Sequence, residues 1–184
     1  MDLGLLILRL ALAAILYMHA TQKTLGWFSG SGLDRMTEVF HGLGQRPGRH
    51  MVRLAAACEV SAAALLTLGL ITPLGAAILA GTMTVAGGSQ TIAKGTVWNA
   101  LGGGEYPLVL ATFAIVLGFA GPGRWSIDDA IGAPWVNHSG TAAVTGLIVL
   151  VVAALAAGAA LLRTRSLLRP AAAAESAPPA AEGS

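Results

Sequence analysis

Residues 141–162 read TAAVTGLIVLVVAALAAGAALL and contain no charged side chain. A helix crosses the hydrocarbon core of a bilayer with about 20 mostly apolar residues, so this stretch predicts a transmembrane helix. The whole chain agrees, because only 11% of its 184 residues are charged and 55% are hydrophobic. Soluble domains carry about 25% charged residues. We therefore expect a polytopic membrane protein, not a cytosolic enzyme, a nucleic-acid-binding protein or a disordered chain.

Four further apolar stretches precede this one. They cover residues 3–23, 51–71, 74–93 and 106–120. The last is short unless it extends through Glu105. Thr72-Pro73 predicts a tight helical hairpin between the second and third stretches, because proline cannot continue a helix but suits a helix start. The expected fold is all-α: a polytopic membrane bundle of four transmembrane helices plus a fifth at the C-terminus.

The segments between and after these stretches divide the chain further. Residues 31–44 repeat apolar side chains at helical spacing with charges between them, which predicts an amphipathic helix on the membrane surface. A second short helix is expected from Ser126, its N-cap, to Ile131. From Ala171 onward the chain is rich in Ala and Pro, which predicts disorder. The expected divisions are a four-helix membrane domain (1–131), an extra transmembrane helix (132–163) and a basic, then disordered tail (164–184).

Basic residues concentrate at one side of the predicted spans. They are Lys23, Arg35, Arg46, Arg49 and Arg53 in and around the first loop, and Arg163, Arg165 and Arg169 after the last span. Loops rich in Lys and Arg stay in the cytoplasm. We therefore expect the N-terminus outside and the C-terminus in the cytoplasm. No basic region precedes the first apolar stretch, so we expect no cleaved signal peptide.

A few polar side chains fall inside the apolar stretches. A charge buried in hydrocarbon costs at least ~2.5–3.5 kcal/mol, so such residues pair with one another or line a cavity. Arg9, His19 and Lys23 share one face of the first span, and Lys23 is expected to extend to the membrane surface. Glu59, in the antiparallel second span, lies at a depth between those of Arg9 and His19. The group forms either a structural ion pair or a polar pocket that binds a head group or relays protons.

Glu105 follows three glycines, residues 102–104. A carboxylate in the first helical turn is favoured by the helix dipole, and glycines permit the turn, which is a sufficient structural account. The alternative is that the glycines let the chain approach a ligand, with Trp98, Asn99 and Glu105 lining its site. The candidate pocket therefore comprises Arg9, His19, Glu59, Trp98, Asn99 and Glu105. The sequence has no metal-binding motif, and its single cysteine, Cys58, is expected to be an inert packing residue.

Several motifs resemble the DoxX family of small bacterial membrane proteins. They are LRL at 8–10, HATQKTLGWF at 19–28, Glu59, LGLIT at 68–72, Trp98-Asn99, GGGEYPL at 102–108 and GPGRWSID at 121–128. The resemblance covers residues 3–131 and implies a four-helix bundle in the bacterial inner membrane. The fifth span is an addition to that pattern.

Relatives named for thiosulfate:quinone oxidoreductase imply a membrane subunit of a redox or oxidative-stress complex. In that role the bundle would hold a quinone and receive electrons through soluble redox partner proteins. Two other functions stay open: a non-catalytic membrane anchor or assembly factor for soluble enzymes, and a small-molecule transporter. The sequence leaves open whether the protein is an enzyme.

Overall fold

The computed structural model describes residues 2–136 and 139–175, and these form helices with no strand. The order is α1 (Asp2–Thr24), α2 (Gly32–Gly42), α3 (Gly48–Leu68), α4 (Thr72–Lys94), the 3₁₀ turn η1 (Asn99–Leu101), α5 (Glu105–Ala120), α6 (Ile127–Ala130) and α7 (Ser139–Glu175). The all-α prediction is confirmed. The two short helices also form where expected, and the Ser126 hydroxyl caps α6 by accepting the Asp129 N–H at 3.1 Å.

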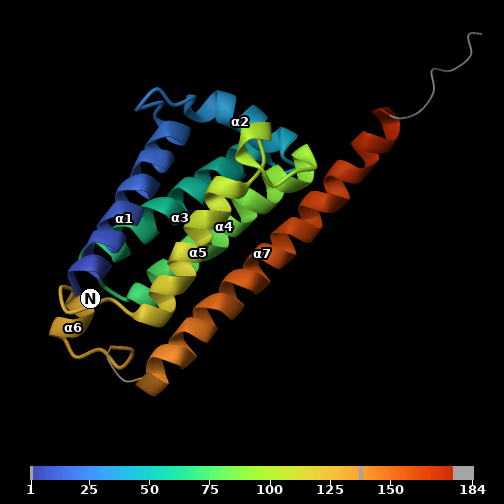
Figure 1. Ribbon diagram of the computed structural model, residues 1–184. Coiled ribbons are helices and arrows are strands. Elements are labelled where there is room, and N and C mark those ends of the chain that lie inside the picture. The colour runs from blue at the N-terminus through green and yellow to red at the C-terminus, as the bar shows by residue number, and fades with distance from the viewer. Residues whose placement is uncertain (1, 137–138, 176–184) are drawn as a thin grey trace, which may run out of the picture.

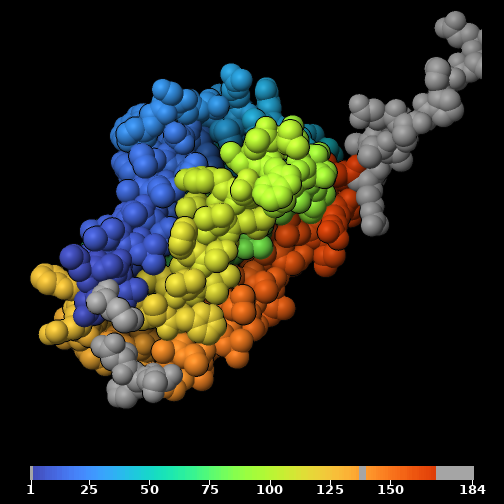
Figure 2. Space-filling model, viewed as in Figure 1, coloured from blue at the N-terminus to red at the C-terminus, as the bar shows by residue number. Residues whose placement is uncertain are grey.

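The five long helices run side by side (Figure 1). α4 lies at the centre and packs against α3, α5 and α7, while α1 packs against α3. α2 crosses one end of the bundle, and α6 lies at the other end near the N-terminus. Figure 2 shows α7 lying along the outside of the bundle beside α5. The N-terminus and the end of α7 lie at opposite ends of the bundle (Figure 1).

Among the described residues, three helical segments are long and apolar enough to cross a membrane: Asp2–Thr24, Gly48–Leu68 and Gly140–Leu168. α5 is apolar but shorter, and it begins at Glu105 as the sequence suggested. α4 has 23 residues, many of them Gly, Ala and Thr, which let its neighbours pack closely. The bundle core is mainly Leu and Ala, with Leu16, Leu66, Leu79 and Leu117 almost fully buried.

The C-terminal tail differs from expectation. α7 continues without a break through residues 164–175, where we expected a basic and then disordered segment. Alanine, leucine and arginine have high helix propensity, so the helix continues into this segment even though Pro170 lies within it. The remaining predicted disorder falls on residues 176–184, outside the described residues.

Candidate functional site

The structure separates the polar residues of the spans into two groups at different depths. Arg9 is fully buried, but it does not reach Glu59. Its guanidinium donates to the carbonyl of Leu66, Nη1 to O 3.4 Å, and also to the carbonyl of Trp125. Arg9 therefore joins α1 to the end of α3 and to the segment before α6, by way of backbone groups.

Asp128 completes this first group, and it ends the 121–128 motif but was not among the candidate site residues. It is fully buried, and its carboxylate accepts the N–H groups of Ile71 and Thr72, at 2.7 and 2.8 Å, at the start of α4. Anions are favoured at helix N-termini. Gly69 lies between the two charges with φ +60°, and a Cβ there would be 1.7 Å from Arg9 Nη1. This group is a structural connection that fixes the α3–α4 turn.

The second group is an ion pair between Lys23 and Glu59. The Glu59 side chain is 0% exposed and that of Lys23 only 16%. The expectation that Lys23 extends to the membrane surface is therefore wrong. Helical side chains lean toward the N-terminus of their helix, so the long lysine chain turns back into the bundle and meets Glu59 on α3. Of the two carboxylate oxygens, Oε1 contacts Lys23, and Oε2 is buried with no hydrogen-bond partner among the described residues.

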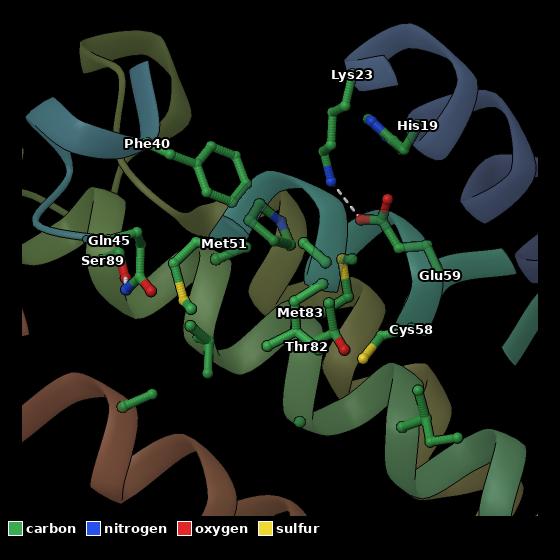
Figure 3. Close-up of a pocket in the computed structure, with 18 of the residues that line it drawn as sticks. His19, Lys23, Phe40, Gln45, Met51, Cys58, Glu59, Thr82, Met83 and Ser89 are labelled. Carbon is green, nitrogen blue, oxygen red and sulfur yellow. Dashed lines mark hydrogen bonds and ion pairs between the residues drawn. The ribbon is translucent and has the colours of Figure 1, made fainter. Parts of the chain in front are cut away.

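This ion pair borders a cavity of about 580 Å³ beneath α2. Figure 3 shows Lys23, His19 and Glu59 gathered on one side of it, with Gln45 and Ser89 on the other. The His19 ring packs against Tyr106 of α5, with ring centroids 5.8 Å apart. The rest of the wall is mostly apolar. It includes Met36, Val39 and Phe40 of α2, Met51, Leu54 and Cys58 of α3, Ile78, Met83 and Val85 of α4, and Val152, Ala156 and Ala160 of α7.

The cavity brings together three of the six candidate residues: His19, Glu59 and Asn99. Arg9 belongs to the structural group described above. Trp98 and Glu105 do not line the cavity either. Glu105 Oε2 accepts the Asn99 N–H at 3.0 Å and so stabilises the η1 turn.

The three glycines before α5 serve backbone packing. A Cβ on Gly104 would be 1.9 Å from the Gly87 carbonyl oxygen, and one on Gly103 would be 2.4 Å from the Thr96 oxygen. Such distances leave no room for any side chain. The glycine run therefore lets α5 begin directly against α4, and Glu105 stands in the first turn of α5, where the structural account placed it.

Gln45 was not among the candidate residues. Its Nε2 donates to the hydroxyls of Ser89 on α4 and Thr164 on α7, both at 2.8 Å, and the two hydroxyl residues are buried. A glutamine in a connecting loop carries no signal of such a role. Lys23 had a usable signal, since it stands four residues after His19 and so shares its helix face.

Other buried polar atoms lack partners, but they do not border the cavity. Arg9 Nε and Thr72 Oγ1 are examples, and neither residue lines the cavity. Glu59 Oε2 therefore differs from them in having space beside it. Within residues 2–136 and 139–175, no group of three or more His, Cys, Asp or Glu side chains is arranged to hold a metal ion.

Comparison with known proteins identifies the membrane domain. Residues 4–91, which contain α1 to most of α4, match the family model DoxX. No curated protein and no solved structure matches the chain. The match includes Arg9, His19, Lys23 and Glu59, and it ends before the glycine run and the 121–128 motif. With its apolar helices long enough to span a bilayer, the chain is an integral membrane protein whose residues 4–91 match the DoxX family.

Proposed function

We propose that the protein is a membrane subunit of a redox system and that it binds the head group of a quinone beside the Lys23–Glu59 pair. The observation that carries this proposal is Glu59 Oε2, a buried carboxylate oxygen that borders a cavity and has no partner among the described residues. Buried polar groups are nearly always hydrogen-bonded, so such an atom marks a place where a ligand can donate.

The cavity has the size and character of a small-molecule site. Ligand pockets measure roughly 300–1,000 Å³ and are mostly apolar with a few well-placed polar groups. Lys23 and His19 carry N–H donors that suit the carbonyl oxygens of a quinone. Glu59 accepts, which suits the hydroxyl of the reduced quinol. The same three side chains can therefore bind both redox forms, while a partner protein supplies the electrons.

Direct binding measurements test this proposal. The protein in lipid nanodiscs is titrated with ubiquinone and menaquinone and, under reducing conditions, with the corresponding quinols, and saturable binding is expected for at least one pair. His19→Phe should weaken quinone binding about 2–10-fold, the loss of a hydrogen bond worth ~0.5–1.5 kcal/mol, and Glu59→Gln should weaken quinol binding about 10–100-fold, the loss of a charge-assisted hydrogen bond worth ~1.5–3 kcal/mol. Glu38→Gln, on the exposed face of α2, is the matched control and should bind like wild type.

The variants and the wild-type protein together show whether a quinone binds at this site. His19→Phe leaves the Lys23–Glu59 pair in place, so it remains informative if Glu59→Gln impairs folding. Wild-type protein that binds neither quinone saturably would refute the quinone proposal. Equal affinity in wild type, His19→Phe and Glu59→Gln would show binding elsewhere.

A second candidate function is an anchor for soluble partner proteins. The observation that favours it is the continuation of α7 through residues 164–175, past the apolar span, with Arg163 and Arg165 exposed. Crosslinking in native membranes should recover one defined partner with the full chain. Deleting residues 164–184 should abolish that crosslink without lowering the thermal stability of the bundle. An unchanged crosslinking pattern would count against this function.

A further inference from the structure

We infer that the ligand of this cavity is an amphiphile with a long hydrocarbon tail, and that the tail lies in the bilayer-facing part of the cavity between α3 and α7. The inference extends the proposed function, on which it relies for the head-group position only. It makes α7, which lies outside the matched residues 4–91, a wall of the binding site.

The cavity extends from one side of the bundle to the other. His19 and Lys23 on α1 line one part, and Val152, Ala156 and Ala160 on α7 line another. α1 and α7 lie on opposite sides of the molecule, with α3, α4 and α5 between them (Figure 1). A head group beside Glu59 therefore has continuous space leading from it toward α7.

The part next to α7 opens sideways. Leu54 on α3, Leu74 on α4 and Val152 on α7 all line the cavity, yet they are 56%, 47% and 48% exposed. All three belong to long helices of the bundle, two of them in segments apolar enough to span a membrane. Surface exposed within a membrane-spanning segment faces lipid, so the opening beside Leu54 and Val152 faces the bilayer interior.

The cavity is long enough to hold a hydrocarbon tail as well as the ring of a head group. Its α4 wall includes residues from Leu74 to Gln90. At 1.5 Å per residue these are about 24 Å apart along the helix, against about 30 Å for the hydrocarbon core. Small residues, among them Gly81 on α4 and Ala156 on α7, keep this path open. Polar groups gather near the α2 end, as they would around the head of an amphiphile.

α7 is held in place as a wall of this path. A Cβ on Gly88 would be 2.6 Å from Leu161 Cδ1, so α7 approaches α4 closely there. Gln45 bonds to both Ser89 and Thr164, which connects the α2–α3 loop, α4 and α7 at the polar end of the cavity. These contacts fix the spacing of α4 and α7 while leaving the gap toward α3 unfilled.

A photoreactive probe tests the inference. The full-length protein in lipid nanodiscs is irradiated with a ubiquinone analogue that carries a diazirine at the end of a ten-carbon tail, and labelled residues are mapped by mass spectrometry. A palmitic acid with the same terminal diazirine serves as a second probe. Labels are expected on the cavity-lining residues of α3 and α7, such as Leu54 and Val152. Labels confined to α1 and α5, or spread evenly over the bundle surface, would overturn the inference.

A matched pair of variants tests whether the tail of the probe occupies this path. Ala156→Trp fills the tail path, whereas Leu155→Trp adds the same side chain one residue earlier, at a position that is 70% exposed and does not line the cavity. Labelling at Leu54 should fall at least tenfold in Ala156→Trp and stay within twofold in Leu155→Trp. An equal effect of the two variants would contradict the tail path. If Ala156→Trp does not fold, the label map of the wild-type protein still decides.

The two probes separate failure of this inference from failure of the proposed function. Labelling of the α3–α7 path by the fatty acid probe, with no saturable quinone binding, would support an amphiphile site and refute the quinone. Saturable quinone binding with no tail label on α3 or α7 would support the head-group site and refute the tail path. Absence of both would refute both.

Discussion

The Lys23–Glu59 ion pair makes a quantitative prediction about stability. Lys23→Met keeps the length of the side chain but removes its charge, and it leaves Glu59 with a fully buried carboxylate and no cation. Breaking a buried ion pair by removing one partner costs ~3–5 kcal/mol. For a chain of this size each kcal/mol shifts the melting temperature by ~2–4 °C, so the expected loss is roughly 6–20 °C.

The double variant Lys23→Met/Glu59→Gln isolates the interaction itself. Removing both charges leaves no uncompensated ion, and replacing a whole buried pair is often neutral or stabilising. The double variant should therefore melt well above Lys23→Met and close to wild type. The difference between the double variant and the sum of the singles is the coupling free energy of the pair.

The assay is thermal unfolding in one detergent, with Arg49→Met as control. Arg49 pairs with Asp34 at 2.8 Å, but their side chains are 52% and 89% exposed. An exposed pair contributes ~0–1 kcal/mol, so this control should barely change the melting temperature. If Lys23→Met behaves like Arg49→Met, the pair is solvated and the reasoning fails. If the double variant is as unstable as the sum of the singles, the two residues act independently.

Four further predictions concern the packing and the topology. Gly69→Ala should destabilise by more than the ~1–2 kcal/mol of a left-handed alanine, because its Cβ would displace Arg9, as thermal unfolding can measure. Asp128→Asn should cost ~1–3 kcal/mol in the same assay, since an amide cannot accept both N–H groups that begin α4. Gly104→Ala should be strongly destabilising, whereas Gly4→Ala, which meets no atom within 4 Å, should change stability by less than ~1 kcal/mol. A reporter fused to the C-terminus should be active only in the cytoplasm, and activity outside would contradict the expected orientation.

The sequence was sufficient to predict the fold class because lipid restricts the backbone so strongly. Only helices or closed barrels satisfy their hydrogen bonds in hydrocarbon, and the uncharged run at 141–162 is too long for a barrel strand. The hairpin at Thr72-Pro73 and the start of α5 at Glu105 follow from local chemistry in the same way. The end of α7 was missed because the composition from Ala171 onward, with Pro170 just before it, is typical of a disordered segment, whereas the helix continues through Pro170 to Glu175.

The partners of the buried charges were harder to predict. Sequence gives the depth of a residue along its helix, but not the direction in which a long side chain turns. We expected Arg9 to lie within reach of Glu59 and Lys23 to extend away from it, and the structure shows the opposite for each. The partners of Arg9 are backbone carbonyls, which no pattern of side chains reveals. The 121–128 motif contains Asp128, but only the structure shows that its carboxylate accepts the N–H groups of the α3–α4 turn.

The candidate site lies partly inside and partly outside the residues that match the DoxX model. This division has a consequence for ligand specificity. His19, Lys23 and Glu59, which would bind a head group, lie within residues 4–91. Tyr106 on α5 and Val152 and Ala156 on α7, which complete the cavity, lie beyond them. Head-group chemistry depends on a few fixed polar contacts, whereas an apolar path depends mainly on the volume that its walls leave open. We therefore expect substitutions on α7 to alter preference for tail length while leaving head-group recognition unchanged, and substitutions on α1 or α3 to do the reverse.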